Sequence, residues 1–242
     1  MPPSNNDEWH TLINARINEV KALPAFVPMN PPSSLSGHIA LTIDHTLLKP
    51  DATFSQIDAL CDEALRYKFK SCCVNGSHVS QAAKRLAGSS TIPCCVVGFP
   101  LGACTTKSKA FETQVAIEDG AKEIDMVLNI GALKSGNYVL VHDDIATVVS
   151  TAAAQPVKVI LETVFLTDEE KIAASFIAAE AGAAFVKTCT GFSGGGASVM
   201  DVALMKKAVR YKGNVQVKAS AGIKSLNACL EMLEAGADRI GT

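Results

Sequence analysis

From residue 39 onward, short apolar stretches rich in β-branched residues alternate with longer alanine-rich stretches. The short stretches have the length and composition of buried strands, and the longer ones have helical spacing. We predict strands at 39–45, 70–75, 92–98, 123–129, 157–163, 184–189, 214–219 and 238–242, and helices between them, for example at 54–67, 106–119, 168–181, 198–210 and 225–235. Buried strands alternating with helices favour right-handed βαβ units and a parallel sheet.

Eight strand segments predict an α/β fold of the (β/α)8, or TIM barrel, type. An open doubly wound sheet is the alternative. The length of 242 residues suits one barrel, because such domains commonly contain about 200–250 residues. The last strand segment stops at Thr242, so the helix that would follow it is absent from this chain. We therefore expect the barrel to be incomplete at its C-terminal end.

The N-terminal part of the chain has a different pattern. Residues 7–23 place Trp9, Ile13 and Val20 at helical spacing, which predicts a short amphipathic helix. Residues 24–37 are rich in proline and serine and are predicted to form a linker. These features divide the chain into a helix and linker at 1–37 and a barrel domain at 38–242. We expect the helix either to cap one end of the barrel or to be a partly ordered extension.

Composition narrows the class of protein. The formal net charge of −2 gives no indication of nucleic acid or of an anionic membrane surface as a partner. The eight cysteines lack the spacing of metal ligands, so we expect free thiols in a reducing compartment and no metal site. We found neither a signal sequence nor a membrane-spanning apolar run, and we predict a soluble cytoplasmic protein.

Four ionisable residues interrupt the apolar strand segments: Asp125, Lys158, Lys187 and Lys218. Each lies on the next predicted strand after the one before it. Burying a charged group without a partner costs several kcal/mol, so such an array needs a reason. Active-site groups of a barrel lie near the C-terminal ends of its strands, which favours a catalytic site. The alternative is a structural ion network, in which Glu162 would balance the charge of Lys158.

Two neighbouring lysines suit one kind of carbonyl chemistry. A neutral amine can attack a carbonyl and form a Schiff base, and a second, cationic lysine nearby helps to keep the first one neutral. The iminium then withdraws electrons from a carbon–carbon bond, and an aspartate at a strand end can move the protons. This chemistry requires no metal and no cofactor.

Glycine-rich segments follow two of the lysine strands, at 188–197 after Lys187 and at 219–224 after Lys218. Glycine lets backbone N–H groups approach a phosphate closely, and the loops after the last strands of such barrels often bind phosphate. A flexible loop without a ligand is the alternative. The segments do not match the P-loop pattern.

Several of these segments together resemble the deoxyribose-phosphate aldolase family. They are 43–50, 97–102, 123–127, 185–192, 217–223 and 239–242, and the resemblance extends from about residue 39 to the end. It implies a TIM barrel that reversibly cleaves 2-deoxy-D-ribose 5-phosphate to D-glyceraldehyde 3-phosphate and acetaldehyde, in deoxyribonucleotide catabolism. Family members usually continue beyond the position of Thr242 with serines that help to hold phosphate.

The resemblance also implies roles for individual residues. Lys187 matches the lysine that forms the Schiff base, Lys218 the second lysine that tunes it, and Asp125 the aspartate that shuttles protons. Supporting polar positions are Asp44 and Lys158. The residues expected near the substrate phosphate are Thr190, Gly191, Gly222 and Gly241.

Two other functions remain open at this point. One is another lysine-dependent aldolase that acts on a different sugar phosphate, and the other is a catalytically silent relative that binds sugar phosphates. The expected partners are small phosphorylated sugars and aldehydes, with no nucleic acid and no membrane. Assembly into a homo-oligomer is compatible with the sequence.

Overall fold

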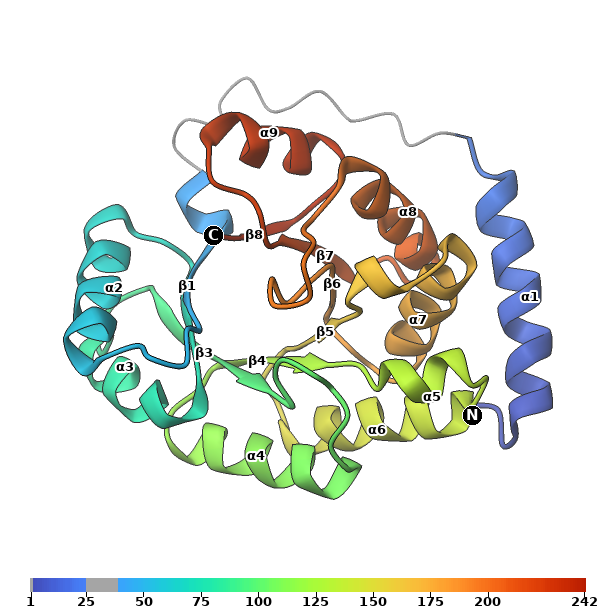
Figure 1. Ribbon diagram of the computed structural model, residues 1–242, viewed down its shortest axis with the longest axis horizontal. Helices are drawn as coiled ribbons and strands as arrows, with labels where there is room; N and C mark the ends of the chain where they lie inside the picture. The colour runs from blue at the N-terminus through green and yellow to red at the C-terminus, as the bar shows by residue number, and fades with distance from the viewer. Residues whose placement is uncertain (1, 25–38) are drawn as a thin grey trace.

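The computed structural model describes residues 2–24 and 39–242, and its centre is a closed barrel of eight parallel strands (Figure 1). The strands are β1 (Ile43–Leu47), β2 (Ser71–Val74), β3 (Ile92–Val97), β4 (Glu123–Val127), β5 (Val157–Ile160), β6 (Phe185–Lys187), β7 (Gln216–Ser220) and β8 (Arg239–Gly241). Each strand pairs with the next one in sequence, and β8 pairs with β1. The predicted TIM barrel is therefore confirmed, and the open sheet is excluded.

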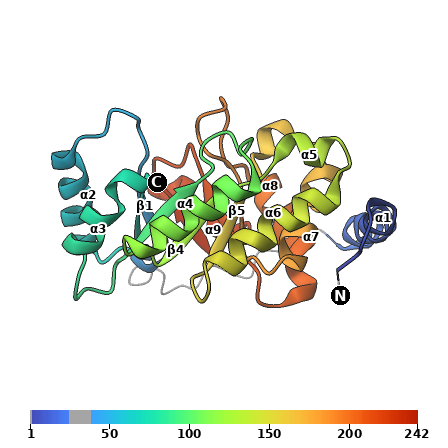
Figure 2. The ribbon, with the colours of Figure 1, turned by 90° about the horizontal axis from the view of Figure 1, so that it is seen from below.

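Helices surround the barrel along its outside (Figures 1 and 2). They are α1 (Asn6–Ala22), α2 (Phe54–Tyr67), α3 (Val79–Arg85), α4 (Thr106–Glu118), α5 (Ile130–Lys134), α6 (Tyr138–Thr151), α7 (Asp168–Glu180), α8 (Val199–Val209) and α9 (Leu226–Glu234). Capping boxes at Thr53 and Thr167 fix the starts of α2 and α7, because each threonine accepts from the third helical N–H. None of the helices in the described part of the chain is long and apolar enough to cross a bilayer.

All eight strands are shorter in the structure than in the sequence analysis, and for two of them the local cause is clear. Residues Ile39–Thr42 form a 3-10 turn, and the Thr42 hydroxyl donates to the Ile39 carbonyl at 2.8 Å. Strand pairing begins only at Ile43. The strand predicted at 157–163 ends at Ile160, because Glu162 adopts a left-handed backbone conformation with φ of 56°. That conformation turns the chain away from the sheet.

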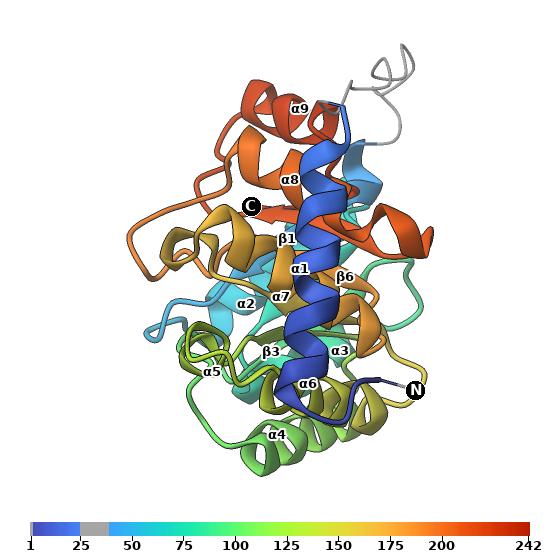
Figure 3. The ribbon, with the colours of Figure 1, turned by 90° about the vertical axis from the view of Figure 1, so that its right-hand side faces the viewer.

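Helix α1 packs against the outside of α6, α7 and α8 (Figure 3). Trp9, Ile13 and Val20 are buried there, so the predicted amphipathic helix is confirmed. The expectation that it caps one end of the barrel is wrong, because its apolar face packs on the outer surface of the layer formed by α6, α7 and α8. The Arg16 guanidinium also donates to the Ala208 carbonyl at 2.8 Å, near the C-terminal end of α8. Most of the predicted linker, 25–38, lies outside the described residues.

Strand register brings the charged residues together inside the barrel. Asp125 is paired with Lys158, Lys187 with Lys218, and Lys218 with Arg239. Side chains on a strand alternate between its two faces, so residues paired in register across parallel strands point to the same face. The charged side chains consequently share the barrel interior.

Candidate active site

Asp125 lies at the centre of a buried network of charged side chains. Its Oδ2 accepts from the Nζ of Lys187 at 2.7 Å and from the Nζ of Lys218 at 2.8 Å. Its Oδ1 accepts from the Nζ of Lys158 at 2.8 Å. Asp125, Lys158 and Lys218 are completely buried, and Lys187 is 3 % exposed. The structure therefore brings together the four residues that the sequence analysis placed on successive strands.

Asp44, Glu123 and Arg239 extend the network beyond this carboxylate. Asp44 Oδ2 lies 2.6 Å from the Nζ of Lys218, and Asp44 Oδ1 accepts from Arg239 at 2.7 Å. Arg239 also donates to Glu123, which receives a 2.5 Å hydrogen bond from Lys158. These contacts connect Asp44 and Lys158, both expected as supporting residues, to the central carboxylate.

Glu123 and Arg239 were missed by the sequence analysis, although a signal was available for one of them. Glu123 precedes Asp125 by two positions, so the alternation of side chains along β4 directs both to the interior. The expected pairing of Lys158 with Glu162 is wrong. The left-handed turn directs the Glu162 carboxylate toward Thr190 and away from the barrel interior.

The network fixes the protonation of Asp125 and of Lys218. Burial disfavours a charge on Asp125, but Lys158, Lys187 and Lys218 outweigh burial and hold the pKa of its carboxyl well below the ordinary value. Burial also opposes a charge on Lys218, but Asp125 and Asp44 outweigh it and raise the pKa of Lys218 above the ordinary value. Asp125 thus remains an anion and Lys218 a cation at neutral pH.

Counted at full ionisation, the network has one surplus positive charge. Its cations are Lys158, Lys187, Lys218 and Arg239, and its carboxylates are Asp44, Glu123 and Asp125. Release of one proton from a lysine would make the network neutral. A buried cluster without net charge is less costly than one with an excess charge.

A pocket of about 170 Å³ identifies which lysine can meet a ligand. Lys187 lines this pocket, whereas Lys158 and Lys218 do not, and both of those are fully buried. The pocket continues past Cys189 and Thr190 to Gly222 and Lys224. Of the three strand lysines, Lys187 is thus the one whose amine can reach a carbonyl bound in the pocket.

The residues expected near phosphate lie at or beside the same pocket. Thr190, Gly222 and Gly241 line it. Gly191 lies next to it, and a Cβ there would be 3.3 Å from the Cβ of Ala221. Gly241 has a steric role as well, because a Cβ at that position would come within 3.2 Å of Lys218 Cε.

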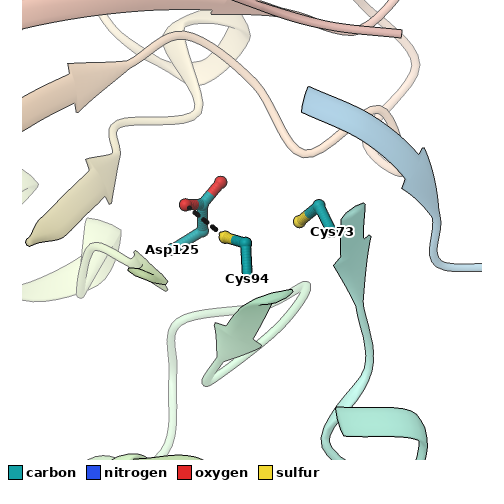
Figure 4. A group of neighbouring side chains, drawn as sticks. All are labelled: Cys73, Cys94 and Asp125. Carbon is teal, nitrogen blue, oxygen red and sulfur yellow. Dashed lines mark hydrogen bonds between the residues drawn. The ribbon is translucent and has the colours of Figure 1, made fainter. Parts of the chain in front are cut away.

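Two buried cysteines, Cys73 and Cys94, lie beside Asp125 (Figure 4). The Sγ atoms of Cys73 and Cys94 and a carboxylate oxygen of Asp125 lie within 4.8 Å of one another. Cys94 donates to Asp125 Oδ1 at 3.1 Å. The ammonium groups of Lys158 and Lys218 already lie against this carboxylate, and their charge would repel a metal cation. The geometry favours hydrogen bonding over metal ligation.

Replacement of Arg239 by methionine tests the structural part of the network. It leaves the buried Asp44 and Glu123 without one of their cationic partners, so we expect a loss of about 3 kcal/mol in the free energy of unfolding. Urea unfolding followed by circular dichroism measures the change. A variant as stable as the unmodified chain would show that the remaining lysines balance both carboxylates.

The fold and the site together define a barrel aldolase with its candidate lysines inside the barrel. The family model for DeoC/LacD family aldolases matches residues 38–242, and the chain belongs to this family. Deoxyribose-phosphate aldolase 2 of Staphylococcus aureus (strain MSSA476) is 56 % identical over 204 residues, which are 84 % of this chain and 92 % of that protein. The deoxyribose-phosphate aldolase of Staphylococcus haemolyticus is 57 % identical over 199 residues, 82 % and 90 % of the two chains.

Solved structures support the same assignment. A crystal structure from Coccidioides immitis has a TM-score of 0.95 and 40 % identity, covering all of this chain and 95 % of the other. The tetrameric deoxyribose phosphate aldolase of Aeropyrum pernix has a TM-score of 0.80 and 28 % identity, covering 100 % of this chain and 94 % of its own. Both similarities cover the whole of this chain.

Proposed function

We propose that this chain reversibly cleaves 2-deoxy-D-ribose 5-phosphate to D-glyceraldehyde 3-phosphate and acetaldehyde through a Schiff base on Lys187. The observation that carries the proposal is the position of Lys187, which contacts both Asp125 and the pocket. Curated relatives with the same named activity, 56 % and 57 % identical over most of this chain, support the choice of substrate.

The first half of the reaction forms and uses the iminium. The neutral Lys187 amine attacks the C1 carbonyl of the open-chain sugar, and loss of water gives the iminium. Removal of the proton from the C3 hydroxyl then breaks the C2–C3 bond, and its electrons move into an enamine that joins C2, C1 and the lysine nitrogen. D-Glyceraldehyde 3-phosphate leaves. Protonation of C2 and hydrolysis of the new iminium release acetaldehyde and restore the amine.

The neighbouring residues give this sequence its proton path and its charge balance. Asp125 lies within hydrogen-bond distance of the Lys187 nitrogen, so it can accept and return protons during carbinolamine formation and breakdown. Lys218 keeps a positive charge beside the same carboxylate. The loops at 190–197 and 221–224 supply donors for the phosphate at the far end of the pocket.

Borohydride reduction in the presence of acetaldehyde tests the covalent step. We expect peptide mass mapping to find an ethyl group on Lys187, because reduction converts the iminium into a stable secondary amine. The Lys187→Ala variant provides the control and should remain unlabelled. Label on Lys218 or Lys224, or no label in a folded sample, would contradict the assignment.

Product analysis separates this activity from the two alternatives. Release of acetaldehyde from deoxyribose phosphate supports the proposal, whereas cleavage of a different sugar phosphate would favour another lysine-dependent aldolase. Binding without turnover would favour a silent relative, which the presence of Lys187, Lys218 and Asp125 argues against.

The division at residues 37 and 38 and the assembly of the chain stay predictions. The family match begins at residue 38, which supports an aldolase domain over 38–242. The tetramer of the Aeropyrum pernix enzyme supports a homo-oligomer here as well. Sedimentation of the purified protein measures its oligomeric state directly.

A further inference from the structure

Glu162 is a buried carboxylate that the proposed reaction does not use. Its side chain is 1 % exposed, and the described residues give it no ion pair. Its hydrogen bonds all come from the loop that follows β6. Thr190 donates its backbone N–H to Oε1 at 3.2 Å and its hydroxyl to Oε2, and the Ser193 hydroxyl donates to Oε2 at 3.1 Å. One carboxylate thus collects three donors from residues 190–193.

The backbone of Glu162 has a conformation that is uncommon for a residue with a side chain. Glu162 has φ of 56° and ψ of 64°, a left-handed conformation that side chains disfavour and glycine adopts easily. The flanking residues hold it there, because Leu161 N–H donates to the Lys187 carbonyl at 2.9 Å and Thr163 N–H to the Thr188 carbonyl at 3.1 Å. The turn directs the carboxylate at the loop just beyond Lys187.

The hydrogen bonds to Glu162 determine which donors of the loop remain free. Both Thr190 donors are used, and the Thr190 hydroxyl also accepts from the Phe192 N–H at 3.1 Å, which closes a tight turn. Gly191 lies inside this turn with φ of 85°. In the described part of the chain the Gly191 N–H donates to no partner, and neither does the N–H of Gly222, which lies in the separate loop after β7 and lines the pocket. These two N–H groups are available to a ligand.

We infer that Glu162 is a positioning residue for phosphate recognition, acting through Thr190 and the turn at 190–193. A carboxylate suits this task because it only accepts, and hydrogen bonds to a charged acceptor are stronger than those to a neutral one. The Glu162 carboxylate holds the turn in one conformation before the ligand binds. Binding therefore does not have to order the turn, and its entropic cost is smaller. The ligand class is a phosphate monoester, and its identity as deoxyribose phosphate rests on the proposed function.

The Glu162→Gln variant tests the inference by separating two substrates. The amide adds an N–H group opposite donors that already need an acceptor, so the turn should lose its conformation. We expect KM for 2-deoxyribose 5-phosphate to rise about 10-fold or more, with kcat changed by less than about 3-fold. Cleavage of unphosphorylated 2-deoxyribose should change by less than about 2-fold, because that substrate makes no use of the phosphate donors.

Thr190 offers a matched pair of control variants. Thr190→Val removes the hydroxyl and should reproduce the KM effect of Glu162→Gln. Thr190→Ser keeps the hydroxyl, so its KM should lie closer to that of the unmodified chain than the KM of Thr190→Val does. Equal losses on the phosphorylated and unphosphorylated substrates in Glu162→Gln would assign Glu162 to general stability and overturn the inference.

Phosphate binding gives a measurement that does not depend on turnover. Inorganic phosphate added to the unmodified chain should shift the amide signals of Gly191 and Gly222 in NMR spectra, and Glu162→Gln should need about 10-fold more phosphate for the same shift. Equal phosphate affinity in the two proteins would overturn the positioning role. Weaker phosphate binding by the variant would support the positioning role, whether or not the enzyme cleaves deoxyribose phosphate. Failure of the unmodified chain to cleave deoxyribose phosphate would contradict the proposed function instead.

Discussion

Lys187→Ala will lower kcat for deoxyribose phosphate cleavage by about 10⁴-fold or more, because no other lysine of the network lines the pocket. The fold should survive, since Asp125 keeps Lys158 and Lys218 as partners and the network loses its surplus charge. Steady-state kinetics with purified protein measures the loss, and circular dichroism with thermal unfolding checks the fold. A folded variant that retained more than about one hundredth of the activity would exclude Lys187 as the nucleophile.

Lys218→Leu will lower kcat by about 10² to 10⁴-fold, the range usual for loss of a group that assists proton transfer. The variant removes the cation beside Asp125 and leaves Asp44 without its 2.6 Å partner. Both effects disturb the charge balance of the network around Asp125. Kinetics and urea unfolding measure activity and stability on the same preparation.

Arg239→Met serves as the control for this second variant. Arg239 belongs to the same network and contacts Asp44, but it does not contact Asp125. Arg239→Met should therefore lower the free energy of unfolding but reduce kcat much less than Lys218→Leu does. If Lys218→Leu turned over at a nearly normal rate, or if both variants lost activity in proportion to stability, Lys218 would have no specific part in the chemistry.

The barrel could be predicted because its strands are buried on both faces and appear as apolar segments. The residues at the centre of the site were equally visible, since charges such as Asp125, Lys158 and Lys218 stand out within such segments. Their roles stay predictions until the variants are measured. Their proximity, in contrast, follows from the register of adjacent strands and is a property of the structure.

The remaining features depend on geometry that residue patterns do not specify. Arg239 begins the short strand β8 at the border of a loop, where a charge is unremarkable. Glu162 was assigned to Lys158 because strand spacing was assumed to continue to residue 163, whereas a left-handed turn intervenes. The apolar face of α1 predicted burial, but a pattern on one helix contains no information about which surface it contacts.

The position of α1 has a consequence for synthesis of the chain. A ribosome produces α1 well before α6, α7 and α8, on which its contacts lie, and α8 begins only at Val199. For most of translation, Trp9 and Ile13 have no surface on which to pack. Contacts so distant in sequence form slowly, and exposed apolar side chains meanwhile favour association with chaperones or with other nascent chains. Docking of α1 onto the helical layer must therefore wait until α6 and α7 have emerged, and its contacts with α8 form later still.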